Sequence, residues 1–124
     1  MSKQKTILIV EDESSISNLL KNKLERKGYE VFQAPNGEVG LLIALEKKPD
    51  LILLDLNMPV MDGMTMLNKL RENEWGKKAS VIVLTNLANN EKVEKSIKLG
   101  AFDYLVKNNW SLDEMVKIIK IKLC

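Results

Sequence analysis

Short continuous apolar runs alternate along the chain with segments in which apolar residues return every three or four positions. The runs are Ile7 to Val10, Tyr29 to Ala34, Leu51 to Leu54, Val81 to Leu84 and the mixed Phe102 to Val106. A return of three or four positions is the period of an amphipathic helix, whereas short runs bounded by polar residues are typical of strands. The pattern predicts a strand followed by a helix, five times over. Such alternation favours a parallel sheet with helices on both faces.

Each predicted helix has a small apolar face. In chain order, these faces are Ile16, Leu19, Leu20 and Leu24; Val39, Leu42 and Ile43; Met66, Leu67 and Leu70; Val93 and Ile97; and Met115, Val116 and Ile119. We expect the first helix to end at Lys27-Gly28 and the fourth at Gly100, since glycine favours helix ends. Ser111 with Glu114 predicts a capping box at the start of the fifth.

Polar residues inside two of the runs predict the order of the strands. The first, third and fourth runs are apolar at every position, as is typical of strands buried on both faces. Glu30 and Gln33 interrupt the second run and Asp103 interrupts the fifth, so we expect these two strands at the edges. The resulting order, 2-1-3-4-5, is that of a flavodoxin-like doubly wound five-stranded parallel α/β sheet, here with five helices.

Length and composition fit one domain, which we expect to span residues 1–124. The net charge of +2 gives no general argument for nucleic acid or an acidic membrane as a partner. Cys124 is the one cysteine, so neither a disulfide within the chain nor a cysteine-based zinc site is predicted. No histidine occurs, which excludes Ser-His-Asp and Cys-His catalysis. The first apolar stretch is too short for a signal peptide, and we expect a cytoplasmic protein.

Polar residues that could bind a metal ion or take part in a reaction follow four of the five runs. Glu11-Asp12, Asp55, Thr85 and Lys107 stand at the carboxyl ends of the predicted strands, where open α/β sheets bind ligands. Three neighbouring carboxylates repel one another unless one is protonated or a cation lies among them. An all-oxygen donor set suits Mg²⁺ better than zinc. Asp55 could then act as a nucleophile toward a phosphoryl group, with Thr85 and Lys107 donating to its oxygens.

Each of these residues alone has an ordinary structural explanation. Glu11-Asp12 and Thr85 could cap the helices that follow them, and Asp55 could be a turn residue. Lys107 alone would be a solvated surface lysine. Because these explanations are independent of one another, the coincidence of all four strand ends favours a phosphoryl site.

The chain resembles, over essentially its whole length, the receiver domain of bacterial two-component response regulators. The motifs that carry the resemblance are Glu11-Asp12, Asp55-Leu56-Asn57-Met58-Pro59 with Asp62-Gly63, Thr85, and Gly100-Ala101-Phe102-Asp103-Tyr104-Leu105-Val106-Lys107. The resemblance implies that a histidine kinase or phosphotransfer protein phosphorylates Asp55. It implies that Mg²⁺ is bound by Asp12, Asp55 and the backbone carbonyl of Asn57, with Glu11 assisting through water.

The same resemblance implies a switch built on Thr85 and Tyr104. Phosphorylation would favour a state with a rearranged surface of the fourth helix, fifth strand and fifth helix, which binds an unknown downstream protein. We expect a phosphoacceptor that assists its own phosphorylation and dephosphorylation but is not a turnover enzyme. We expect no direct binding of nucleic acid or membrane, and a monomer or a phosphorylation-dependent dimer.

Three other functions are weighed against this one. A degenerate receiver used only for docking would not need the full set of acids, Thr85 and Lys107. A phosphatase-type enzyme would want a second aspartate where Asn57 stands. A flavodoxin would want a phosphate-binding loop in place of Glu11-Asp12-Glu13. The sequence leaves open whether the chain is whole or a piece of a longer regulator.

The sequence departs from the family after Lys107, where Asn108 replaces the usual proline. A cis bond before a residue other than proline costs about 3 kcal/mol, so we expect a trans bond and a differently shaped turn.

A second departure predicts a long-lived phosphoryl group. In the family, the residues two positions after the aspartate and after the threonine help to set the rate of phosphate loss, and here they are Asn57 and Leu87. The Leu87 side chain cannot hydrogen-bond an attacking water. We expect Leu87→Glu to shorten the lifetime of the phosphoryl group, measured as phosphate release over time. An unchanged lifetime would contradict this prediction.

Overall fold

The computed structural model describes residues 4–56, 58, 60–85, 98, 103–106 and 111–123. The strands are β1 (Thr6–Val10), β2 (Glu30–Ala34), β3 (Leu51–Asp55), β4 (Val81–Thr85) and β5 (Asp103–Val106). The helices are α1 (Ser14–Arg26), α2 (Gly37–Lys47), α3 (Gly63–Glu72), α5 (Leu112–Leu123) and the short 3₁₀ helix η1 (Gly76–Lys78). The predicted fourth helix, with Val93, Ile97 and Gly100, lies outside the described residues.

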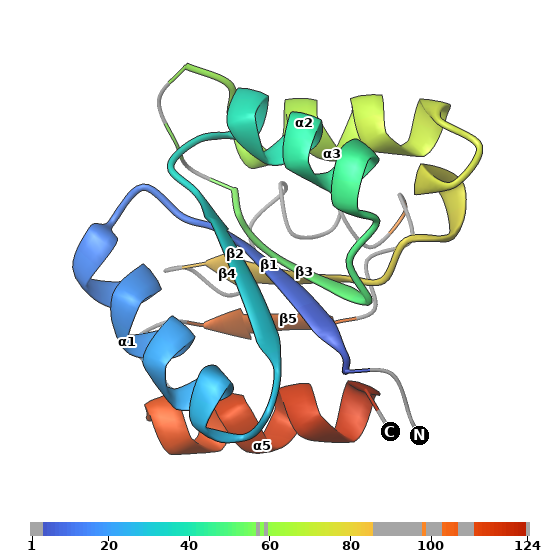
Figure 1. Ribbon diagram of the computed structural model, residues 1–124. Helices are drawn as coiled ribbons and strands as arrows, with labels where there is room; N and C mark the ends of the chain where they lie inside the picture. The colour runs from blue at the N-terminus through green and yellow to red at the C-terminus, as the bar shows by residue number, and fades with distance from the viewer. Residues whose placement is uncertain are drawn as a thin grey trace.

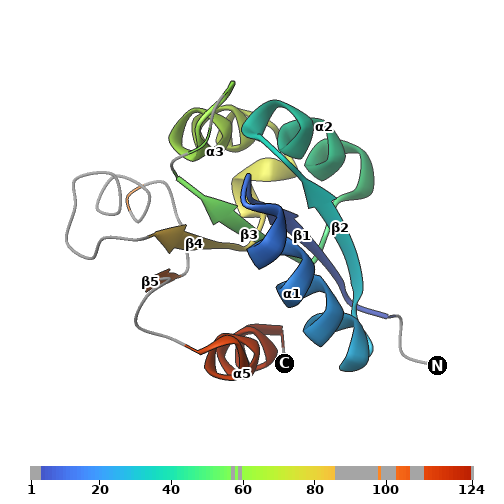
Figure 2. The same cartoon turned by 90° about the vertical axis from the view of Figure 1, so that its left-hand side faces the viewer.

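The five strands form one parallel sheet in the order β2-β1-β3-β4-β5, which confirms the predicted order (Figure 2). The two strands interrupted by polar residues lie at the edges, and the apolar strands β1 and β3 lie inside, with the side chains of 7–10 and 51–54 fully buried. Because all the strands run in one direction, their carboxyl ends meet at a single edge of the sheet.

The sheet is covered by α2 and α3 on one face and by α1 and α5 on the other (Figures 1 and 2). Side chains alternate between the two faces of a strand. Leu8 and Leu54 therefore pack under α2 and α3, whereas Ile9 and Leu53 pack against α1 and α5. The predicted apolar faces of α3 and α5 are confirmed as buried. The result is a three-layer α/β structure with a core on each side of the sheet.

The predicted apolar face of α1 is wrong at Leu19, which is 50% exposed. The buried side chains of this helix are Ser17, Leu20 and Leu24, which share a face because they are three and four positions apart. The buried Ser17 hydroxyl accepts a hydrogen bond of 2.8 Å from Nε2 of Gln33. This bond offsets the cost of placing a hydroxyl where an apolar side chain was expected.

The predicted face of α2 is wrong at Leu42, which is 64% exposed. Small residues face the sheet instead, and Gly40 lies so close that a Cβ there would be 2.9 Å from the methyl groups of Val10. This close approach moves the larger side chains to the flanks, where Val39 and Ile43 are partly buried against the core. Apolar periodicity counts large side chains, so it misses a helix that contacts its sheet through glycine and alanine.

Two predicted helix ends are confirmed. Helix α1 ends at Arg26, and Gly28 follows with φ of +96°, a backbone conformation that favours glycine. The start of α5 is a capping box, because the Glu114 amide donates to the Ser111 hydroxyl at 3.2 Å and the Ser111 amide donates to the Glu114 carboxylate at 3.3 Å.

The start of α3 packs directly against the backbone that carries Asp55. Asp62 caps α3 by accepting a 2.9 Å hydrogen bond from the Thr65 amide. The Gly63 amide donates to the Leu56 carbonyl at 3.1 Å. A Cβ on Gly63 would collide with the Asp55 carbonyl oxygen and lie 2.7 Å from Cα of Leu56. A glycine at position 63 therefore lets α3 hold the end of β3 in place.

We expect Gly63→Ala to displace Asp55 and to lower any Mg²⁺ affinity, besides destabilising the fold by about 1–3 kcal/mol through overpacking. Urea unfolding and calorimetric Mg²⁺ titration measure the two effects. Gly76→Ala is the matched control, since its Cβ would collide with the Leu70 carbonyl, away from Asp55. Equal Mg²⁺ affinity in the two variants would show that Gly63 does not position Asp55.

Candidate functional site

Three carboxylates meet at the carboxyl edge of the sheet. One oxygen from each of Glu11, Asp12 and Asp55 lies within 4.8 Å of the others. Val10 pairs with Leu54, so Glu11 and Asp55 follow at the same level on neighbouring strands. The register of two parallel strands thus brings together acids that are more than 40 positions apart in the sequence.

Two of the three carboxylates are nearly inaccessible to solvent. Glu11 is 2% exposed and Asp55 is 4% exposed, whereas Asp12 is exposed. The Glu11 amide donates to the Ala34 carbonyl at 3.0 Å, which continues the pairing of β1 with β2 by one residue. Asp55 is the last residue of β3 rather than a turn residue. The backbone of the sheet therefore fixes both buried acids.

Helix capping does not explain the Glu11-Asp12 pair. The N-cap of α1 is Glu13, and its side chain makes no capping hydrogen bond. The Glu13 amide does donate to Oε1 of Glu11, at a long 3.4 Å. Capping of α1 therefore does not explain why two acids stand at the end of β1.

Of the remaining predicted site residues, the structure places the backbone of Thr85 and of Tyr104. Thr85 ends β4, and because Asp55 pairs with Leu84, the backbone of Thr85 stands one step further along the same edge. The backbone of Tyr104 lies in β5, opposite Val83. Asn57 and Lys107 lie outside the described residues, as do the predicted departures at Leu87 and Asn108.

A small open groove adjoins the acids between the start of α1 and the end of β2. Its volume is about 200 Å³, and Glu11 and Asp12 form part of its wall. Gln33 donates from Nε2 to the Ser17 hydroxyl at 2.8 Å and to Oδ1 of Asn18 at 2.9 Å, which ties β2 to α1 beside the acids. The sequence did not predict this link. The only signal was a serine on the core side of a helix and a glutamine in an edge strand.

The loop that follows Asp55 contains a strained residue. Val60 has φ of 67° and is 77% exposed, and β-branched residues seldom adopt this left-handed conformation. Strain of this kind concentrates in functional loops. The neighbouring Met58, Met61 and Met64 pack against the core under α2 and α3.

The donor set of this site fits a hard divalent cation. Carboxylate oxygens are preferred ligands of Mg²⁺, and the cluster contains neither a sulfur nor an imidazole donor. A cation there would offset the cost of burying Glu11 and Asp55 as anions. The arrangement also leaves one nearly buried carboxylate, Asp55, in the centre of the edge as a potential nucleophile.

Residues 7–120 match the family described as the response regulator receiver domain. The chain is 38% identical over 117 residues to the DNA-binding dual master transcriptional regulator RpaA of Synechocystis. It is 42% identical over 105 residues to the alkaline phosphatase synthesis transcriptional regulatory protein PhoP of Bacillus subtilis. These alignments cover 94% and 83% of the chain but 48% and 42% of the relatives. The chain thus spans about half or less of the curated relatives it matches.

Two solved structures are similar to this chain in fold. The chemotaxis protein CheY4 of Vibrio cholerae superposes with a TM-score of 0.88 at 29% identity, covering 96% of this chain and 98% of that one. The receiver domain of the sensor histidine kinase PA1611 of Pseudomonas aeruginosa, with a magnesium ion coordinated in its active-site cleft, superposes with a TM-score of 0.86 at 28% identity, covering 98% of both chains.

No helix in the described part of the chain is long and apolar enough to cross a membrane. The strand order, the acidic edge and the match over residues 7–120 agree with one another. The chain belongs to the response regulator receiver domain family.

Proposed function

We propose that this chain is a phosphoacceptor signalling module in which Asp55 takes a phosphoryl group from a histidine kinase or phosphotransfer protein. The observation that carries the proposal is the cluster of Glu11, Asp12 and Asp55, with oxygens within 4.8 Å of one another at the carboxyl edge of the sheet. Burying an aspartate at a strand end lowers the stability of the fold. A role as a nucleophile accounts for its position there.

In the proposed step, a carboxylate oxygen of Asp55 attacks the phosphorus of the donor. The bond between phosphorus and the donor nitrogen breaks, and that nitrogen takes up a proton from solvent. The product is an aspartyl phosphate. Sheet pairing holds the Asp55 backbone during this step, so that the carboxylate needs little reorganisation to reach in-line geometry.

Asp12, Asp55 and the Asn57 carbonyl would hold Mg²⁺ in this proposal, with Glu11 acting through water. The ion supplies positive charge that neutralises the acids and the phosphoryl oxygens. The magnesium in the PA1611 receiver domain supports this assignment. We assign the hydroxyl of Thr85 and the ammonium of Lys107 to donate to the phosphoryl oxygens.

The proposed output is a shift in population rather than turnover. Thr85 moves toward the phosphoryl group, Tyr104 turns inward, and the surface around β5 and α5 changes its affinity for a downstream protein. Two relatives carry names of transcriptional regulators, which supports a regulatory rather than an enzymatic role. We further propose that this segment works in the cytoplasm, as a monomer or a phosphorylation-dependent dimer, and does not itself bind nucleic acid.

The proposal is tested by incubating the protein with a small-molecule phosphodonor, with and without Mg²⁺, and measuring its intact mass. We expect a phosphoryl adduct only with Mg²⁺, and none in Asp55→Asn, because an amide oxygen is a poor nucleophile.

Asp62→Asn is the matched control. Asp62 belongs to the same loop, and asparagine can accept the capping hydrogen bond from Thr65 equally well. The control variant should therefore take up phosphate like the wild type. An adduct on Asp55→Asn would contradict the assignment. No adduct on any variant would favour a docking scaffold, and continuous release of phosphate would favour an enzyme.

A further inference from the structure

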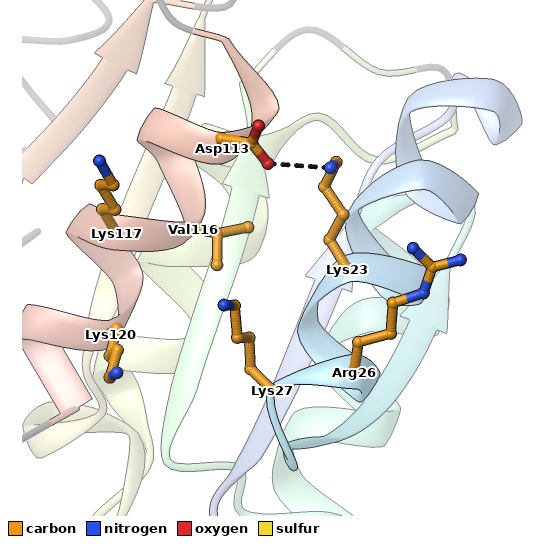
Figure 3. Close-up of a pocket in the computed structure, with 7 residues that line it drawn as sticks. All are labelled: Lys23, Arg26, Lys27, Asp113, Val116, Lys117 and Lys120. Carbon is orange, nitrogen blue, oxygen red and sulfur yellow. Dashed lines mark hydrogen bonds and ion pairs between the residues drawn. The ribbon is translucent and has the colours of Figure 1, made fainter.

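A groove with a strong positive charge lies between α1 and α5, on the face of the sheet opposite α2 and α3 (Figure 3). Lys23, Arg26 and Lys27 line it from α1 and its C-cap, and Lys117 and Lys120 line it from α5. Asp113 and the nearly buried Val116 complete the wall. The volume of about 590 Å³ is suited to a group of side chains rather than to a single small ion.

This groove holds more positive charge than the whole chain. Five of the 19 basic residues line it, but only one of the 17 acidic residues, so its net charge is +4 against +2 for the chain. The rest of the chain is therefore slightly negative. The charge is concentrated at one place by the packing of two helices that are about 90 positions apart in sequence.

The one acid of the groove is already engaged by one lysine. Asp113 and Lys23 form an ion pair with 2.9 Å between Oδ1 and Nζ, which spans the two helices. This hydrogen bond and the charge of Lys23 lower the pKa of the Asp113 carboxyl, and the charges of Lys117 and Lys27 lower it further. The positive potential thus extends across the groove from both sides.

The other four cations have no ion-pair partner among the described residues. All four are exposed and therefore solvated by water: Arg26, Lys27, Lys117 and Lys120.

Stability of the helices explains only part of this arrangement: Lys23, Arg26 and Lys120 lie in the last turns of their helices, where positive charge is favourable. Lys23 and Lys27 are four positions apart, and Lys117 and Lys120 are three apart, so like charges face each other along each helix. Such pairs destabilise a helix, and the packing of α1 against α5 adds repulsion between the helices. Asp113 is the one acid among these lysines, and it balances only part of their charge.

We propose that this groove docks an acidic segment of a partner protein, which places its carboxylates against Lys117, Lys120 and Arg26. The site is separate from the acidic cluster, because none of its lining residues is shared with the groove around Glu11 and Asp12. Docking there does not require phosphate on Asp55, so it goes beyond the proposed phosphoacceptor function.

The shape and the lining favour a protein segment over nucleic acid. The site is a concave groove between two helices, whereas duplex DNA is convex and would reach only its rim. No aromatic side chain lines the described groove, and single strands are commonly bound by stacking on aromatic rings. A phosphate chain would also bring negative charge against Asp113, whereas a protein segment can place a neutral or basic residue there.

The test uses a fluorescein-labelled oligoglutamate peptide and the unphosphorylated protein at low ionic strength, about 0.05 M, where charge pairs are weakly screened. Fluorescence anisotropy gives the affinity, and ¹⁵N amide shifts locate the site. The double variant Lys117→Gln with Lys120→Gln should bind about tenfold more weakly, since it removes two of the proposed contacts. Asp113→Asn should bind more tightly, because it removes the one acid.

Lys69→Gln with Lys78→Gln is the matched control. It removes the same charge from exposed positions on α3 and η1, on the other face of the sheet, and should leave the affinity within about twofold. All variants should still accept phosphate from a small-molecule donor, which shows that they are folded.

Equal weakening in the two double variants, no peptide binding, or amide shifts confined to other surfaces would overturn the proposal. So would tighter binding of tripolyphosphate, or of a DNA duplex of matched charge, at the same amides.

Discussion

Electrostatic repulsion among three carboxylates is the constraint on which the site depends. Oxygens of Glu11, Asp12 and Asp55 lie within 4.8 Å of one another, and two of the three side chains are nearly buried. At that distance, and at an effective dielectric constant of about 20, each pair of full charges costs roughly 3 kcal/mol. A fold of ordinary stability cannot ignore such a cost. The cluster persists because the rest of the structure holds the three side chains together. A cation bound among them would be attracted by the same negative charges that repel one another.

The sheet supplies the force that holds these acids together. The inner strands β1 and β3 bury every side chain of 7–10 and 51–54. Because these strands pair in parallel, their carboxyl ends lie at the same edge of the sheet. Helix α3 adds a second restraint, since Gly63 contacts the backbone at Asp55 and Leu56. Apolar burial thus fixes charged groups in a geometry that they would not adopt alone, and this stored repulsion suits a site for Mg²⁺ and phosphate.

The strand order and the acidic edge could be predicted because they depend on local patterns. Glu30, Gln33 and Asp103 marked the edge strands, and polar residues directly after apolar runs marked the site. What depends on tertiary packing escaped prediction. Leu42 is exposed because Gly40 brings α2 close to the sheet. The basic groove forms only when α5 packs against α1, so no window of sequence contains it. Asn57 rests on the family resemblance and Lys107 on its place after the fifth apolar run, and both lie outside the described residues.

The repulsion is tested most directly by urea unfolding of the wild type and of Asp12→Asn, with and without Mg²⁺. Mg²⁺ at about 100 times its dissociation constant should stabilise the wild type by about 2.7 kcal/mol. Asp12→Asn should be more stable than the wild type without Mg²⁺ and should gain much less from the ion, because one of the three charges is gone. A wild type that does not respond to Mg²⁺, together with an Asp12→Asn variant of lower stability in its absence, would show that Asp12 makes a net stabilising contribution and would contradict the proposed site.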